Sequence, residues 1–220
     1  MTERSLAVHR TARYAVLGGA NEHPGEVWFV CHGYRQLARS FLGYFAAIDD
    51  GSRVIVAPEA LSRFYVEGAD KGGADAVVGA SWMTREDRRH EISDYVSYLD
   101  TVYAKTFEGI DRSAVRVTIL GFSQGAATVC RWIDGGRVRS DRLILWGGMV
   151  PQDVDWSNEA PVRKPALFLV VGAQDEYATP AAVAEGEKRL RQNRLPYELV
   201  RFEGGHHLNK HVLQRLASAE

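Results

Sequence analysis

Gly121-Phe122-Ser123-Gln124-Gly125 is the most informative segment of this chain. It follows an apolar run over residues 115–120 and leads into a segment with helical character over residues 126–132. A G-x-S-x-G pattern between a strand and a helix is typical of a turn so tight that only small residues fit two positions before and after the serine. The serine hydroxyl then projects above the sheet. The alternative is an ordinary Gly/Ser turn, so catalytic partners must be sought elsewhere in the chain.

Strand-like and helix-like segments alternate on both sides of this motif. Apolar runs predict strands over residues 13–17, 27–31, 53–57, 115–120, 143–146, 166–171 and 197–202. Helical patterns lie between them, over residues 37–48, 86–107, 124–134, 180–193 and 207–218. This alternation predicts an α/β fold in which a mainly parallel sheet of about seven strands is covered by helices on both faces.

Residues 59–83 interrupt this alternation with a long, Gly-rich connection. Long Gly-rich connections in a compact domain are usually functional loops or mobile segments. No linker, repeat or low-complexity tract divides the chain of 220 residues. We therefore expect a single domain over residues 1–220, with an irregular, flap-like insertion at residues 59–83 and no large cap domain.

The composition and net charge of the chain argue against two classes of binding partner. The chain has 27 basic and 28 acidic residues, a net charge of −1 and no basic block, so neither nucleic acid nor an anionic membrane is an expected partner. The first residues lack the apolar core of a signal peptide, and no apolar run is long enough to span a bilayer. We expect a cytoplasmic protein in which Cys31 and Cys130 are reduced core residues.

A catalytic serine needs a base, a group that orients the base, and donors for an oxyanion. Asp175 follows the strand at residues 166–171 and is the candidate acid; the neighbouring Glu176 competes, but the strand-Gly-x-x-Asp spacing favours Asp175. His206 follows the last strand and a Gly-Gly turn, which would let an imidazole fold back over the sheet edge. His207 is the less favoured alternative, expected to begin the last helix.

Two backbone amides are candidates for the oxyanion hole. One is that of Gln124, directly after the serine, and the other is that of Tyr34, in the loop after the strand at residues 27–31. His32 in this loop is expected to brace it by hydrogen bonding rather than act as a base. His207 and His211 have the i, i+4 spacing of a metal-ligand pair but lack a third ligand, so no metal is expected.

With these residues in view, the chain resembles the phospholipase/carboxylesterase family of α/β-hydrolases, which includes the acyl-protein thioesterases. The matching motifs are Val30-Cys31-His32-Gly33, Gly121-Phe122-Ser123-Gln124-Gly125, Gly172-Ala173-Gln174-Asp175 and Gly204-Gly205-His206. The resemblance implies the α/β-hydrolase fold and a serine esterase without cofactor. It also implies a nucleophile at Ser123, an acid at Asp175, a base at His206, and oxyanion amides at Tyr34 and Gln124.

The expected activity is hydrolysis of short- to medium-chain carboxylic esters through an acyl-enzyme. An acyl-thioesterase or a lysophospholipase with the same triad is the main alternative, and a non-catalytic binding protein is disfavoured because Ser123 and His206 are both present. The expected partner is a small ester or thioester, with a homodimer left open. The side chains Phe64, Tyr65, Trp82 and Met83 are expected to line an acyl pocket, or else to fill the core under the long loop.

Overall fold

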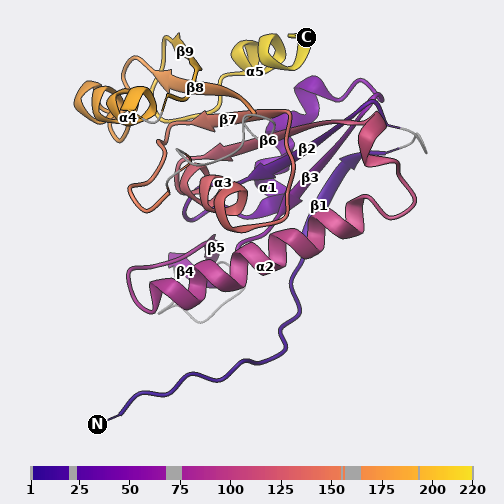
Figure 1. Cartoon of the computed structure of the whole chain (residues 1–220), viewed down its shortest axis with the longest axis vertical. Helices are drawn as coiled ribbons and strands as arrows, with labels where there is room; N and C mark the ends of the chain where they lie inside the picture. The colour runs from indigo at the N-terminus through magenta and orange to yellow at the C-terminus, as the bar shows by residue number, and fades with distance from the viewer. Residues whose placement is uncertain are drawn as a thin grey trace.

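A seven-stranded, mainly parallel sheet runs through the molecule (Figure 1). The computed structural model describes residues 2–19, 24–67, 76–154, 156, 165–192 and 194–219. In spatial order the strands are β1 (Tyr14–Gly18), β3 (Arg53–Pro58), β2 (Glu26–Cys31), β6 (Arg116–Phe122), β7 (Arg142–Trp146), β8 (Ala166–Gly172) and β9 (Tyr197–Phe202). Only β1, at one edge, is antiparallel to its neighbour. The predicted α/β architecture is confirmed.

Helices cover both faces of this sheet. The helix α1 (Ala38–Leu42), the 3-10 turn η1 (Gly43–Ile48) and α5 (Lys210–Ser218) pack on one face. On the other face lie α2 (Arg88–Thr106), α3 (Gln124–Gly135) and α4 (Pro180–Gln192), while a short 3-10 turn, η3 (Arg112–Ala114), leads into β6. Among the described residues, no helix is both long and apolar enough to cross a bilayer.

The last helix begins later than predicted. The side chain of Asn209 caps α5 by accepting hydrogen bonds from the amides of His211 and Val212. An asparagine in this position satisfies amides that would otherwise lack partners in the first turn of a helix. His207 therefore lies in the loop before α5, and its expected place as the first residue of the helix is wrong.

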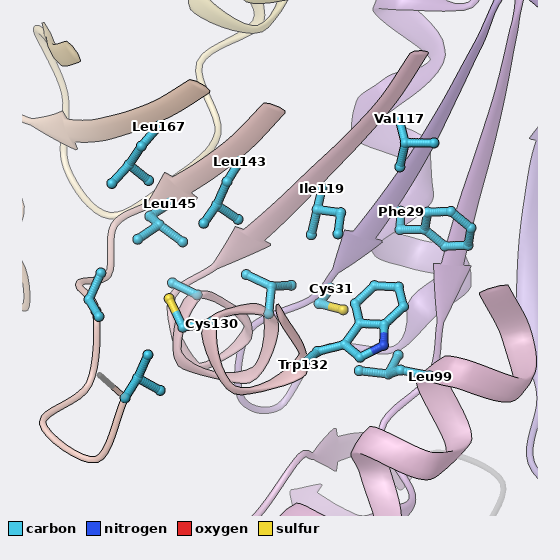
Figure 2. Packing of buried hydrophobic residues seen from close by; sticks show 14 of the residues in the cluster. Phe29, Cys31, Leu99, Val117, Ile119, Cys130, Trp132, Leu143, Leu145 and Leu167 are labelled. Carbon is cyan, nitrogen blue, oxygen red and sulfur yellow. The ribbon is translucent and has the colours of Figure 1, made fainter. Parts of the chain in front are cut away.

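The core on the α2–α3 face packs side chains of β2, β6, β7 and β8 against those of α2 and α3 (Figure 2). Alternate residues of each strand point to this face, as the two-residue period of a strand requires. The fully or nearly fully buried side chains drawn there include Phe29, Leu99, Val117, Ile119, Trp132, Leu143, Leu145 and Leu167. Cys31 and Cys130 are free and fully buried among them, as predicted.

Residues 59–83 differ from the sequence prediction. The segment is not irregular in its described part: β4 (Ser62–Glu67) and β5 (Val77–Ser81) pair as an antiparallel two-stranded sheet, which we call the β4–β5 hairpin. The side chains of β4 alternate between half-buried and exposed, so one face of the hairpin rests on the domain. Glycines in the segment hid this short alternating pattern. The tip of the insertion lies outside the described residues.

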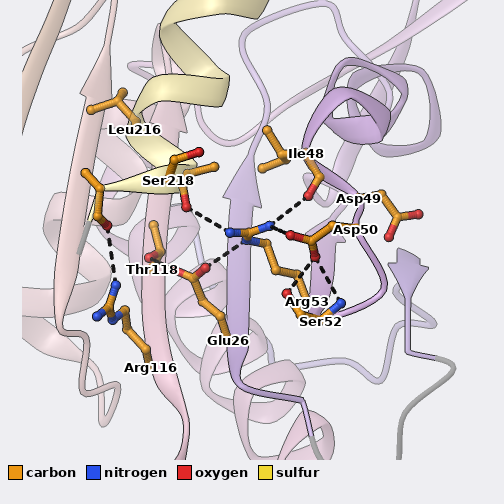
Figure 3. A network of polar contacts seen from close by, with 12 residues as sticks. Glu26, Ile48, Asp49, Asp50, Ser52, Arg53, Arg116, Thr118, Leu216 and Ser218 are labelled. Atoms are coloured by element: carbon orange, nitrogen blue, oxygen red, sulfur yellow. Dashed lines mark hydrogen bonds and ion pairs between the residues drawn. The ribbon is translucent and has the colours of Figure 1, made fainter.

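A network of polar side chains lies at the amino-terminal ends of the central strands (Figure 3). Glu26, at the start of β2, accepts hydrogen bonds from Arg53 Nε at 2.9 Å and Thr118 Oγ1 at 2.9 Å. Arg142 Nη1 lies 3.8 Å from the same carboxylate, and burial lowers the pKa of this arginine. Arg53 also donates to the carbonyl oxygen of Ala217 at 2.8 Å, which ties α5 to the sheet.

Glu26→Ala is expected to lower the free energy of unfolding by about 3–5 kcal/mol, because it removes the buried carboxylate that faces the largely buried guanidinium groups of Arg53 and Arg142. Urea denaturation followed by circular dichroism measures this loss. The matched control is Asp50→Ala, which removes an exposed partner of the same Arg53 and should cost less than about 1 kcal/mol. Equal effects of the two substitutions would contradict the assignment of Glu26 as the buried centre of the network.

Candidate active site

Ser123 occupies a strained corner between β6 and α3. Its backbone angles are φ 54° and ψ −116°, in a region that residues with a side chain rarely adopt. The flanking glycines explain why the corner can form. A Cβ atom on Gly121 would lie 2.3 Å from the carbonyl oxygen of Gly125, and one on Gly125 would lie 2.2 Å from that of Cys31. The motif therefore folds as the tight turn that its sequence indicates.

Asp175 and His206 meet at the carboxyl ends of β8 and β9. The Nδ1 atom of His206 lies 2.8 Å from Oδ2 of Asp175. A carboxylate can only accept a hydrogen bond, so Nδ1 carries the proton and Nε2 keeps its lone pair. The Asp175 side chain is 2 % exposed and that of His206 is 15 % exposed. The pair thus holds an imidazole in the tautomer that a general base requires.

The Asp175 carboxylate is held by its own loop as well. Its Oδ1 accepts the backbone N–H groups of Tyr177 at 2.9 Å and Ala178 at 2.8 Å. Burial acts to raise the pKa of Asp175, but these two amides and the His206 ring together outweigh it and lower the pKa below its ordinary value. Asp175 is therefore an anion at neutral pH.

The end of β7 brings the serine and the histidine to one place. The amide of Ser123 donates to the carbonyl oxygen of Trp146 at 2.8 Å. A Cβ atom on Gly147, whose φ is 60°, would lie 2.9 Å from the His206 ring, and one on Gly148 would lie 2.8 Å from the Ser123 carbonyl oxygen. The two glycines let both catalytic candidates pack against the same strand end.

Two aromatic rings contact His206. Phe122 lies at a centroid distance of 4.9 Å and the exposed Tyr177 at 4.7 Å. The sequence did not predict these ring contacts, although Phe122 lies within the serine motif and Tyr177 is two residues after Asp175. Sequence reasoning also missed Gly147 and Gly148; the glycine pair directly after a buried strand was the available signal. His207 is exposed and contacts Phe202. Asp175 therefore pairs with His206 as predicted.

The loop after β2 lies against the serine. A Cβ atom on Gly33 would come within 3.2 Å of the Ser123 Cβ atom. His32 is fully buried, its Nδ1 lies 2.8 Å from the Gly33 carbonyl oxygen, and its Nε2 accepts from the Ala60 amide at 3.1 Å. Burial lowers the pKa of His32, which keeps the ring neutral. His32 thus braces this loop, as expected.

The four residues expected to line an acyl pocket separate into different environments. Trp82 is only 2 % exposed, belongs to the core and donates its Nε1 hydrogen to the His32 carbonyl oxygen at 2.8 Å. Met83 is half-buried and packs against the same core. For these two residues, the alternative interpretation as core-filling side chains holds, because they anchor the end of the hairpin beneath the loop.

Phe64 and Tyr65 lie on opposite faces of β4. Phe64 is half-buried and stacks on Tyr34 at a centroid distance of 5.2 Å, beside the loop that follows β2. Tyr65 is 61 % exposed, because the alternation of the strand turns it to the other face. Of the four expected pocket residues, Phe64 therefore contacts the candidate oxyanion loop at Tyr34, and Trp82 contacts it at His32. Among the described residues, no group of three or more metal-ligating side chains is arranged to hold an ion.

Sheet order, the strained serine at the end of β6 and the Asp-His pair after β8 and β9 define an α/β-hydrolase fold. Comparison with solved structures agrees. The chain is similar to esterase PE8, with 19% identity over 95% of this chain and 97% of that one and a TM-score of 0.71. A carboxylesterase from Mesorhizobium loti has 18% identity over 94% and 95% of the two chains and a TM-score of 0.71.

A plant enzyme belongs to the same set of structural neighbours. Acyl-protein thioesterase 2 from Zea mays has 16% identity over 94% of this chain and 96% of that one, with a TM-score of 0.70. No model of a known protein family matches the sequence, and no curated protein sequence matches it. The relationship is therefore one of fold, shared with carboxylesterases and acyl-protein thioesterases.

Proposed function

We propose that this protein is a serine hydrolase that cleaves carboxylic esters through an acyl-enzyme, with Ser123 as nucleophile, His206 as base and Asp175 as the acid that orients it. The observation that carries the proposal is the 2.8 Å contact between His206 Nδ1 and Asp175 Oδ2. Ser123, with φ 54°, packs against the same end of β7 as this pair, where Gly147 faces the His206 ring and Gly148 faces the Ser123 carbonyl oxygen. A strained serine alone would not indicate catalysis. An imidazole whose Nδ1 is held by a carboxylate, and whose Nε2 can accept a proton, supplies the base.

The chemistry follows from these roles. His206 Nε2 takes the Ser123 proton as Oγ bonds to the ester carbonyl carbon, and the carbonyl oxygen becomes an oxyanion. We assign its stabilisation to the backbone N–H groups of Tyr34 and Gln124. The tetrahedral intermediate then releases the alcohol, which takes the proton from His206. Water, deprotonated by His206, attacks the acyl-serine, and the acid leaves as Ser123 regains its proton.

Short- to medium-chain acyl esters are the proposed substrates. This proposal is supported by the small size of the insertion and by the aromatic surface around the site, where Tyr34, Phe64 and Tyr177 are at least partly exposed. Thioesters are the second candidate, because the same nucleophile attacks them and one structural neighbour is an acyl-protein thioesterase. A substrate panel with matched acyl groups on oxygen and on sulfur separates the two.

A fluorophosphonate probe is expected to label the wild-type protein at Ser123 and not to label Ser123→Ala. The reason is that the probe phosphonylates a serine whose proton is removed by a neighbouring base, with fluoride as the leaving group. Labelling is measured by intact-mass spectrometry and the site is located by peptide mapping. A matched control is Ser140→Ala, which removes an ordinary serine that precedes β7 and should leave labelling unchanged. Equal labelling of Ser123→Ala and wild type would refute the proposed function.

A further inference from the structure

The side-chain amide of Gln124, next to the candidate nucleophile, makes three hydrogen bonds with residues 81–83. Its Oε1 accepts the backbone N–H of Trp82 at 3.1 Å. Its Nε2 donates to Ser81 Oγ at 3.1 Å and to the Met83 carbonyl oxygen at 2.8 Å. Three consecutive residues at the end of β5 thus use both donors and one acceptor of a single amide. This arrangement fastens the end of the hairpin to the first residue of α3.

The same strand end also holds the loop after β2. The Arg35 amide donates to the Ala80 carbonyl oxygen at 3.0 Å, and the Ala80 amide donates to the Gln36 carbonyl oxygen at 3.2 Å. Gly79 permits this close approach, because a Cβ atom there would lie 2.5 Å from the Arg35 carbonyl oxygen. The hairpin therefore pairs through its backbone with the residues directly after Tyr34.

These contacts connect two segments that are distant in the sequence. The proposed oxyanion amides belong to Tyr34 and Gln124, and β5 is hydrogen-bonded to the neighbours of the first and to the side chain of the second. An oxyanion hole works only if both donors lie 2.7–3.1 Å from the position of the developing charge. The hydrogen bonds of β5 to both segments can therefore set the distance between the Tyr34 and Gln124 amides.

We propose that the side-chain amide of Gln124 is a positioning group, which holds the Tyr34 and Gln124 backbone amides at the spacing of an oxyanion hole by anchoring β5. The inference rests on the proposed hydrolase function. Glutamine suits this position because it offers an acceptor and two donors on one short, planar group. A glutamate would place a second acceptor against the Met83 carbonyl oxygen, and a methionine would satisfy none of the three contacts.

Gln124→Met is expected to lower kcat by about 10- to 100-fold, less than the 10²- to 10³-fold known for removing an oxyanion donor outright. The backbone N–H of residue 124 remains in the variant and only its anchoring is lost. KM for a p-nitrophenyl ester should stay within about threefold, because the loss concerns the transition state. The inhibition constant of a trifluoromethyl ketone, whose adduct carries an oxyanion, should rise in parallel with the fall in kcat/KM.

Thr128→Val is the matched control on the same helix. Thr128 is fully buried and donates its hydroxyl hydrogen to the Gln124 carbonyl oxygen at 3.1 Å, without contacting the hairpin. Its loss should lower Tm but leave kcat, counted per site labelled by the fluorophosphonate, within about twofold of wild type. If Gln124→Met also keeps wild-type kcat per labelled site, the side chain is only structural and the inference is overturned.

Gln124→Glu provides a second measurement if the methionine variant does not fold. It keeps an acceptor for the Trp82 amide, so kcat should fall less than in a variant without any polar atom, yet by at least threefold. Amide ¹H–¹⁵N spectra give an independent signal: the Tyr34 resonance should shift in Gln124→Glu and not in Thr128→Val. An unmoved Tyr34 resonance together with unchanged kcat overturns the inference.

Failure of the proposed function would look different. In that case Ser123→Ala would hydrolyse the ester as fast as wild type, whatever the Gln124 variants do. A dead Ser123→Ala with fully active Gln124 variants would instead refute only the positioning role. The two proposals are therefore distinguished by the same set of proteins.

Discussion

His206→Ala is expected to lower kcat/KM for a p-nitrophenyl ester by about 10⁵- to 10⁶-fold, the magnitude found when the base of a serine triad is removed. Without the imidazole, neither of the other two members of the proposed triad can take the Ser123 proton and return it to the leaving alcohol. Steady-state hydrolysis measured with protein free of host esterases tests this, and the fluorophosphonate labelling rate should fall with it.

His207→Ala is the matched control, because it removes the same side chain one residue further along. His207 is exposed and packs edge-on against Phe202, while Asp175 pairs with its neighbour. The variant should keep kcat/KM within about threefold of wild type. A collapse of activity in His207→Ala with an active His206→Ala would reverse the assignment of the base and refute the mechanism proposed above.

Asp175→Asn is expected to lower kcat by about 10⁴-fold while the fold is kept. The asparagine Oδ1 can still accept the amides of Tyr177 and Ala178, so the loop should keep its shape. Its NH₂ group, however, would donate toward His206 Nδ1 and force the proton onto Nε2, where the base needs a lone pair. Kinetics at pH 7, with Tm from circular dichroism, separates this tautomer effect from unfolding. A residual kcat above one tenth of wild type would contradict the role of Asp175.

The pH dependence of the unfolding free energy is a second measurement on Asp175→Asn. The pKa of Asp175 is lower in the folded protein than in the unfolded chain, so its ionisation contributes stability above the unfolded pKa of about 3.9. That contribution is lost as the pH falls through the lower, folded pKa. The difference in unfolding free energy between wild type and Asp175→Asn should therefore shrink as the pH is lowered below about 4, as measured by urea titrations.

The sheet and the serine corner could be predicted because their signals are local. Apolar runs of strand length and helical periodicity predicted all seven strands of the main sheet. The small residues Gly121 and Gly125 predicted the strained turn at Ser123, since a larger side chain would clash within the turn itself. Errors arose where the signal was short: the β4–β5 hairpin, obscured by its glycines, and the start of α5, where Asn209 rather than His207 marks the end of the loop.

The amino-acid sequence was enough to predict the succession of strands and helices along the chain, the turn at Ser123, and an acid and a histidine after later strands. Which side chains meet became known from the three-dimensional arrangement. It paired Asp175 with His206, placed Trp82 in the core, and joined Gln124 to the end of β5. These contacts link residues up to 50 positions apart. No local sequence pattern encodes such contacts. They depend on the order in which the strands pair in the sheet, and this order decides which strand ends are neighbours.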